Sequence, residues 1–254
     1  MPESVSASSV NTSSVNASSV NASSDNVSGD RALMPGVWVV VPLFNEAQVI
    51  SGVVRGLRTA FDQVVCVDDG SSDDSAEQAL QSGAVVLRHA LNLGQGAALQ
   101  TGVAYALRDP ATRCVVTFDA DGQHQVDEAE AMARRVLDGE ADAVFGSRFL
   151  DSRSRPGLLK RVVLKGAVVH SNLTSGLHLT DAHNGLRALS RTVCEGIDLT
   201  QNRMAHASQL VEQVGRAGCR VVEHPVHILY TDYSRSKGQS LLNSVNILAE
   251  LFFK

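Results

Sequence analysis

The chain has 254 residues, of which 44% are hydrophobic, 4% aromatic and 19% charged, and its formal net charge is −5. This length and hydrophobic content suit one globular domain with appendages. The acidic balance and the scattered Lys and Arg residues argue against a nucleic-acid partner, and the longest apolar run is too short to span a membrane.

The four cysteines lie far apart, without the spacing of a disulfide framework or a zinc site. The N-terminus has neither the basic nor the apolar region of a signal peptide. We therefore expect a cytoplasmic chain with reduced, mostly buried thiols. These cysteines are Cys66, Cys114, Cys194 and Cys219.

Residues 1–34 are predicted to be a disordered low-complexity tail. Up to Gly29 they are almost wholly Ser, Asn, Ala and Val, with Ser-Ser-Val-Asn-Ala recurring at a period of five, a composition that cannot build a packed core. The globular domain is predicted over residues 35–240, and residues 241–254 are predicted to form a separate amphipathic helix.

The first predicted element is a strand over Val37–Val41, followed by a tight loop and a helix that ends near Ala60. Asn45 is predicted to cap this helix, with Gln48 three residues later in the position of a capping box. A strand followed directly by a helix N-terminus offers free N–H groups to a ligand.

A second strand, Val64–Val67, ends in two aspartates, Asp68 and Asp69. Acidic residues at this position accept hydrogen bonds from ribose or base in nucleotide-binding βα units, so we predict a ligand role for both. The later aspartates of the same stretch favour a turn, and Asp74 with Glu77 is predicted to be a capping box for the next helix.

The third strand is predicted over Ala84–Leu87, and a helix over Ala97–Leu107. Gly94 and Gly96 stand between them, where they could let the backbone approach a phosphate. The alternative is that these glycines only serve the geometry of the loop.

The stretch from residue 114 to 124 carries the strongest chemical signal. Cys114–Phe118 is apolar and β-branched, as expected for a strand buried on both faces, and Asp119 and Asp121 follow it one residue apart. Gly122 permits the turn that brings both carboxylates together. With Gln123 as a third oxygen ligand, the group suits Mg²⁺ or Mn²⁺; the alternative is a solvated acidic turn.

A helix over Val126–Leu137 and a strand over Ala143–Phe145 come next. Because strands alternate with crossovers of helix length, the sequence predicts an α/β fold with a mostly parallel sheet flanked by helices.

The C-terminal third is more polar. We predict helices over Leu158–Leu173 and His206–Gly215, a strand over Arg220–Val226, and a compact polar turn at Asp181–Arg187. The polar segment Tyr230–Gln239 is predicted to be a functional lid, because long loops in compact domains commonly are. The helix over 241–254 has one apolar face, which favours core packing; a membrane surface or a second copy in a homodimer is the alternative.

With these pieces in order, the chain resembles the family 2 glycosyltransferases of GT-A (Rossmann-like) fold, and among them the dolichol-phosphate and polyprenyl-phosphate sugar synthases. The resemblance covers about residues 37–240 and rests on an ordered set of motifs. The motifs are Val39–Glu46, Val67–Asp73, Asn92–Gly96, Asp119–His124, Gly146–Arg148, Asp181–Arg187, Glu223–Val226 and Ser236–Gly238.

This resemblance implies a pocket for a UDP- or GDP-sugar, a Mg²⁺ or Mn²⁺ ion on its diphosphate, and a lipid-phosphate acceptor. The implied donor residues are Pro42, Phe44, Glu46, Asp68, Asp69, Gly94, Asp119 and Ala120, and the implied metal ligands are Asp119, Asp121 and Gln123. The implied catalytic set is Asp181, Arg148, Arg187 and Lys237.

The chain departs from the family pattern at Gln125–Val126, where prolines are common, and at Asn184–Arg187, where Thr/Ser-Gly-Phe-Arg is usual. Membrane-bound relatives also carry transmembrane helices, which are not found in this sequence. The expected location is the cytoplasm, with a peripheral contact at the inner face of the membrane as an option.

A phosphate acceptor is largely ionised at pH 7, so it needs cationic positioning more than a general base. A hydroxyl acceptor, as in cell-wall or polysaccharide synthesis, would need Asp181 as base. Inversion at the anomeric carbon is implied by the family alone. The rivals from other classes are a nucleotidyltransferase, which would place a basic glycine-rich loop after the first strand, and a non-catalytic nucleotide-sugar-binding protein.

Overall fold

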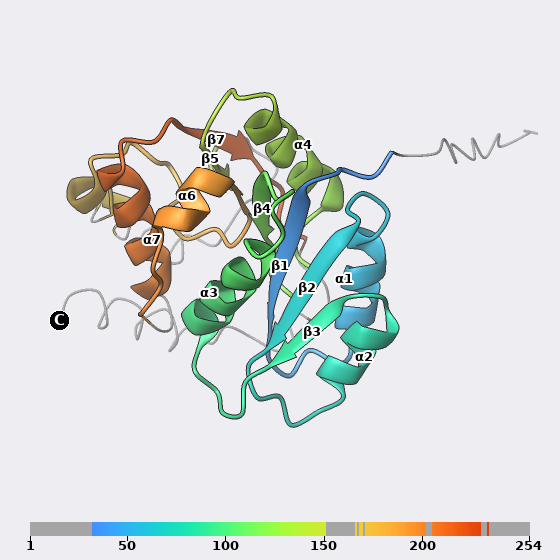
Figure 1. The fold of residues 1–254 in the computed structure, drawn as a ribbon. Helices are drawn as coiled ribbons and strands as arrows, with labels where there is room; N and C mark the ends of the chain where they lie inside the picture. The colour runs from blue at the N-terminus through green and yellow to red at the C-terminus, as the bar shows by residue number, and fades with distance from the viewer. Residues whose placement is uncertain are drawn as a thin grey trace, which may run out of the picture. The chain divides into compact units, whose positions relative to one another are not determined.

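The computed structural model describes residues 32–150, 166, 168–169, 171–201, 205–229 and 233. Within this part of the chain, a 7-stranded sheet has the order β3-β2-β1-β4-β6-β5-β7 (Figure 1). The pairs β1–β2, β1–β4, β2–β3 and β5–β7 are parallel, and β6 is antiparallel to both of its neighbours. The predicted mostly parallel α/β sheet is confirmed. The strands are β1 (Val37–Leu43), β2 (Gln63–Asp68), β3 (Val85–Arg88), β4 (Cys114–Thr117), β5 (Ala143–Ser147), β6 (Arg187–Ser190) and β7 (Val221–Pro225).

Helices cover both faces of this sheet. Alternate residues of β1 enter different cores, because neighbouring side chains of a strand point to opposite faces. Val39 belongs to a core that also contains residues of α1, α2 and α4, whereas Val40 belongs to a second core that contains residues of α3, α6 and α7. Figure 1 shows these helices around the sheet. The helices are α1 (Ile50–Leu57), α2 (Ser75–Gln81), α3 (Gln95–Ala106), α4 (Val126–Leu137), α6 (Arg191–Gly196) and α7 (Ala205–Arg216).

The sequence did not predict β6, which follows the polar turn before Arg187. This strand is four residues long, and it is defined by pairing with β4 and β5 rather than by its own pattern. Arg187 lies opposite Thr117 of β4 and Phe145 of β5. The antiparallel direction therefore places the first residue of β6 at the carboxyl ends of its neighbours.

Both predicted capping boxes are wrong. Helix α1 begins at Ile50 without a side-chain cap, and Asn45 instead has a φ of 53° and accepts a hydrogen bond at Oδ1 from the Ser72 amide, at 2.9 Å. Asp74 precedes α2 but makes no capping hydrogen bond, since Asp73 accepts from the first amide of that helix at 3.1 Å. A contact between two loops replaces the expected cap at Asn45, and the neighbouring Asp73 takes the role expected of Asp74.

The other expectations have mixed outcomes. All four cysteines are free thiols, three of them buried. Met34, placed in the predicted tail, is buried in the core, and its amide donates to the Ala60 carbonyl at 3.0 Å. Among the described residues, no helix has the length and apolarity required to cross a membrane. The predictions for residues 1–31, for most of the helix at 158–173, for the segment with Lys237 and for the helix at 241–254 lie outside the described residues.

Candidate active site

The predicted site residues gather at the edge of the sheet where β1, β2, β4 and β5 end. Parallel strands bring their carboxyl ends to one edge, which is where such sheets bind ligands. Because β6 runs the other way, Arg187 joins the same edge. The guanidinium of Arg187 is close enough to interact electrostatically with Asp119 and Asp181, so residues from three separate motifs meet here.

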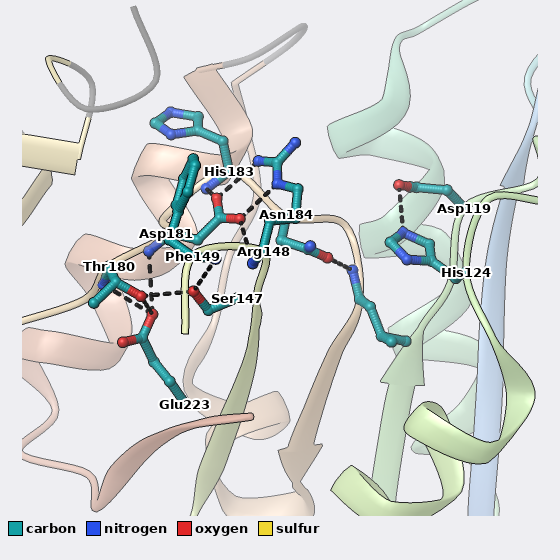
Figure 2. Close-up of polar contacts among 11 residues, drawn as sticks. Asp119, His124, Ser147, Arg148, Phe149, Thr180, Asp181, His183, Asn184 and Glu223 are labelled. Atoms are coloured by element: carbon teal, nitrogen blue, oxygen red, sulfur yellow. Dashed lines mark hydrogen bonds and ion pairs between the residues drawn. The ribbon is translucent and has the colours of Figure 1, made fainter. Parts of the chain in front are cut away.

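Asp119 is oriented by two side chains. Its Oδ2 lies 3.0 Å from His124 Nε2 (Figure 2), and its Oδ1 accepts a hydrogen bond from Gln95 Nε2 at 3.2 Å. Burial alone would raise the pKa of Asp119, but the His124 hydrogen bond and the positive charge of Arg187 hold it below the usual value. Asp119 is thus a fixed and ionised carboxylate.

Asp121 has the opposite character. Among the described residues, its carboxylate accepts a hydrogen bond only from the Gln123 amide, at 3.1 Å. Burial raises the pKa of Asp121 to about 6, and the neighbouring charges of Asp119 and Glu46 add to the effect. Gly122, with a φ of 73°, makes the turn that holds the two aspartates together.

This pair fits a small divalent ion. No group of three or more His, Cys, Asp or Glu side chains in the described part of the chain could hold a metal by itself. Mg²⁺ and Mn²⁺ need few protein ligands where waters and substrate phosphates complete their shell. The repulsion that raises the pKa of Asp121 would be relieved by a bound cation. The hydrogen bonds that the structure gives for Gln123 are made by its backbone. The role of its side chain as a metal ligand therefore stays a prediction.

The loop after β1 is held by the loop after β2. The Asn45 amide donates to Ser71 Oγ at 2.9 Å, and the Glu46 amide donates to Ser75 Oγ at 2.7 Å. Glu46 Oε2 accepts a hydrogen bond from the Tyr233 hydroxyl at 2.7 Å. Tyr233, with Asp121, also lines a cavity of about 440 Å³ beside α1.

The remaining residues of the predicted donor pocket differ in exposure. Phe44 is exposed and Pro42 is half-buried in β1. Ala120 is buried in the core on the α1 and α4 side of the sheet, so any contact of Ala120 with a donor would come from its backbone.

Asp68 is fully buried, and both of its oxygens are engaged within the protein. Oδ1 accepts from the Ser71 amide at 3.1 Å, and Oδ2 accepts from Arg88 Nε at 2.9 Å. In this arrangement Asp68 supports the loop after β2.

Asp69 binds the loop that precedes α3. Its oxygens accept hydrogen bonds from the amides of Leu93 at 2.9 Å and Gly94 at 2.7 Å, and Oδ1 also lies 2.7 Å from His89 Nδ1. Gly94 has a φ of 95°, which a residue with a side chain rarely adopts. The glycine at position 94 therefore allows the hydrogen bond to Asp69, whether or not a ligand binds there.

Arg148 and Asp181 form a two-point ion pair. Arg148 Nε and Nη2 donate to the Asp181 carboxylate at 2.6 and 2.8 Å (Figure 2). Burial would raise the pKa of Asp181, but the Arg148 contacts hold it below the usual value. Glu223 Oε1 fixes the backbone here by accepting from the amides of Thr180 and Asp181, at 2.8 and 3.1 Å. Asp181 is accordingly a weak proton acceptor.

Arg187 is buried, and its guanidinium carbon lies 5.9 Å from the centre of the Phe145 ring. Burial lowers the pKa of Arg187 to about 10, although the negative charges of Asp119 and Asp181 act to raise it. The Nε of Arg187, the Nδ1 of His183 and the Nδ2 of Asn184 are buried without hydrogen-bond partners in the described structure. Unsatisfied buried polar atoms are costly, and three on one turn point to a ligand site.

Sequence reasoning missed several residues of the site. Gly185 packs against Asp119, and three further residues supply hydrogen bonds: Gln95 and Glu223, which lie in motifs named above but were given no role, and His89, which lies outside every motif. The Asn-Gly-Leu-Arg motif was the available signal for Gly185. The other three contacts depend on how distant segments pack.

Gly96, considered for phosphate binding, has another role in the fold. A methyl group on it would lie 2.2 Å from the Gln201 carbonyl oxygen. Its lack of a side chain therefore permits a close contact within the protein, and its contact with a phosphate stays a prediction.

Known proteins resemble this chain over most of its length. The chain is 35% identical over 223 residues to an uncharacterised protein of Methanocaldococcus jannaschii, covering 86% of this chain and 91% of that protein. It is 27% identical over 237 residues to the UDP-N-acetylglucosamine–dolichyl-phosphate N-acetylglucosaminyltransferase of Methanococcus voltae, covering 85% and 94%. It is 30% identical over 227 residues to the polyprenol monophosphomannose synthase of Mycolicibacterium smegmatis, covering 84% and 83%.

The fold is shared with glucosyl-3-phosphoglycerate synthase from Mycobacterium tuberculosis, solved with Mn²⁺ and UDP-glucose. The TM-score is 0.66 at 19% identity, covering 86% of this chain and 78% of that one. Residues 38–197, more than half of the chain, match the family described as glycosyl transferase family 2. The chain therefore belongs to glycosyl transferase family 2 and is a glycosyltransferase of GT-A fold.

Proposed function

We propose that the chain moves a sugar from a nucleotide-diphosphate sugar to a polyprenyl or dolichyl phosphate, with the help of a divalent metal ion. The observation that carries the proposal is the meeting of two kinds of charge at one sheet edge. Asp119 and Asp121 form an acidic pair; Arg187, the first residue of β6, interacts with Asp119 and Asp181, and Arg148, directly after β5, pairs with Asp181. An acidic pair suits a metal-bound diphosphate, and arginines suit a second phosphate.

On the donor side, Asp119 and Asp121 would hold Mg²⁺ or Mn²⁺, which as a Lewis acid stabilises the departing nucleoside diphosphate. His124 and Gln95 keep the Asp119 carboxylate in place. The loop after β1 would receive the nucleoside, because Phe44 is exposed there and Glu46 is held by neighbouring residues.

On the acceptor side, a phosphate is favoured over a hydroxyl. A hydroxyl must lose its proton to a base, and Asp181 is a poor base because Arg148 holds its carboxylate in the charged form. A phosphate monoester is already largely ionised at pH 7. Two relatives described above are named as a dolichyl-phosphate transferase and a polyprenol monophosphomannose synthase. Their names support a lipid-phosphate acceptor.

Two further features belong to this proposal. The family resemblance implies inversion at the anomeric carbon, which NMR of the product would test. A lipid phosphate resides in a membrane, so we place the enzyme peripherally at the inner face, with Lys237 as a further cation for the phosphates.

The test begins with thermal-shift measurements against UDP- and GDP-sugars with and without Mn²⁺, followed by transfer of a radiolabelled sugar to polyprenyl phosphate. We expect one donor class to stabilise the protein only when Mn²⁺ is present, and label to appear in the lipid fraction. Asp121→Ala should abolish both effects while the protein stays folded, whereas Asp138→Ala, at an exposed carboxylate on the end of α4, should change neither.

Two results would contradict the proposal. Undiminished turnover by Asp121→Ala would remove the metal assignment. Transfer to hydroxyl acceptors, with none to polyprenyl phosphate, would remove the acceptor assignment.

A further inference from the structure

We propose that His89 is a positioning residue for the nucleotide-sugar donor, acting through Asp69 on the loop that opens α3. The proposal rests on the function proposed above, because it assumes that Asp69 and this loop face the donor. His89 itself lies behind Asp69 and is assigned no contact with substrate.

His89 connects three elements. Its amide donates to the Asp68 carbonyl at 2.9 Å, so the residue extends the pairing of β3 with β2. Its Nδ1 lies 2.7 Å from Asp69 Oδ1, and its Nε2 lies 2.9 Å from the Thr101 hydroxyl on α3. The side chain is only 11% exposed, which shields both bonds from competing water.

The two partners define the tautomer of the imidazole. A carboxylate can only accept, so Nδ1 carries a proton and donates to Asp69. With a neutral ring, Nε2 then accepts from the Thr101 hydroxyl. Both ring nitrogens are thus satisfied, and the ring is fixed in one orientation.

Asp69 transmits this orientation to the donor loop. It accepts hydrogen bonds from the amides of Leu93 and Gly94, and α3 begins at the next residue, Gln95. The Gln95 side chain donates to Asp119 at 3.2 Å. His89 is therefore linked to Asp119, the first carboxylate of the proposed metal pair, through the hydrogen bonds of Asp69, the peptide bond between Gly94 and Gln95, and the Gln95 side chain.

The number of acceptor positions explains why the contact matters for binding. A carboxylate offers about four lone-pair sites, and three on Asp69 are taken by His89, Leu93 and Gly94. The remaining site can accept one donor from a ligand. Without His89 the carboxylate can rotate, so that this site and the two loop amides lose their fixed direction.

Three variants test the proposal. His89→Leu removes both bonds of the ring, and His89→Asn keeps an N–H donor for Asp69. His178→Leu, at an exposed histidine, is the matched control. The measurements are the Kd for UDP and for the matching UDP-sugar with Mn²⁺ by calorimetry, KM for donor and acceptor, Tm, and amide hydrogen exchange at Leu93 and Gly94 by NMR.

We expect His89→Leu to raise the donor Kd and KM roughly tenfold to a hundredfold, as for the loss of one or two charge-assisted hydrogen bonds. The acceptor KM should stay within about threefold, and His89→Asn should recover most of the donor affinity. Exchange at Leu93 and Gly94 should accelerate in His89→Leu and not in the control.

A lower Tm for His89→Leu with unchanged donor Kd and unchanged exchange at Leu93 and Gly94 would overturn the proposal, because it would show a purely structural role. If the wild-type protein binds neither UDP- nor GDP-linked donors, the function proposed above fails. The exchange measurement would then decide the positioning role by itself: faster exchange supports it, and unchanged exchange overturns it.

Discussion

The backbone of Gly185 lies directly against the carboxylate of Asp119, so closely that a methyl group at position 185 would come within 2.0 Å of Oδ2. The Gly185 carbonyl also accepts a hydrogen bond from the Thr117 hydroxyl at 2.6 Å. The turn before β6 is therefore tied to the end of β4, and the position of Asp119 depends on the absence of a side chain at residue 185.

Gly185→Ala should displace the Asp119 carboxylate and weaken Mn²⁺-dependent donor binding by roughly a hundredfold, while the protein remains folded. The reason is steric, because Asp119 cannot keep its contacts with His124 and Gln95 and also make room for a methyl group. Calorimetric titration of UDP with Mn²⁺ measures the effect. Gly196→Ala, where the added methyl group meets nothing within 4 Å, is the control. Unchanged donor binding by Gly185→Ala would show that binding does not require the observed position of the Asp119 carboxylate.

The raised pKa of Asp121 predicts a specific dependence of stability on pH. Its pKa of about 6 exceeds the unfolded value of 3.8, so the folded protein binds the proton more tightly. The contribution of this group is present below pH 3.8 and is lost as pH rises through 6. Asp121→Asn should therefore become more stable than wild type, by about 2 kcal/mol at pH 7 and by little at pH 4.

Urea unfolding of both proteins between pH 4 and 8 measures this difference. Mn²⁺ should stabilise the wild type at pH 7 and leave Asp121→Asn nearly unchanged, because the ion favours the charged carboxylate. Parallel pH profiles for the two proteins without metal would contradict the assignment.

Local sequence patterns predicted the core strands and the acidic pair. The other features of the fold and the site depend on contacts between distant segments. β1 is a run of β-branched residues buried on both faces, and Asp119 and Asp121 are one residue apart, so both were visible in short windows of sequence. By contrast, β6 becomes a strand only by pairing with β4 and β5. Asn45 does not cap α1, because its side chain instead accepts a hydrogen bond from the loop after β2. A capping box is a local preference that tertiary contacts can override.

We predict that Arg187 is needed for sugar transfer but adds little to the free energy of unfolding. Its guanidinium is buried with Nε unpartnered in the described structure, and a buried charge of this kind is costly. Arg187→Met keeps the apolar stem and removes a costly buried charge, but it also removes a cation that stabilises the charged forms of Asp119 and Asp181. Because these two effects oppose each other, the free energy of unfolding should change by less than about 1 kcal/mol. Sugar transfer should fall by roughly a hundredfold or more, as for the loss of a group that binds phosphate.

Urea unfolding and transfer assays on the same preparation test this prediction. Arg216→Met, at an exposed arginine that pairs with Glu212 on α7, is the matched control. A loss of several kcal/mol in Arg187→Met would instead identify Arg187 as a structural partner of the two aspartates.

Asp181→Asn keeps the shape of the side chain and removes the negative charge that faces the Arg148 guanidinium. Arg148 is 12% exposed and Asp181 is 1% exposed, so the variant should lose about 3 kcal/mol of stability at pH 7. The pKa of Asp181 is lowered in the folded protein, and its contribution is therefore present above the unfolded value and lost as pH falls through the folded one. The difference between variant and wild type should shrink in acid, which urea unfolding at pH 7 and pH 3 would show.

The same variant separates the two acceptor classes. If Asp181 only positions Arg148 for a phosphate, the acceptor KM rises while the donor Kd and the shape of the pH–rate profile stay as in wild type. If Asp181 is instead the base for a hydroxyl acceptor, kcat falls and the limb of the profile that reports its ionisation disappears. The low pKa of Asp181 and its two-point contact with Arg148 favour the first result.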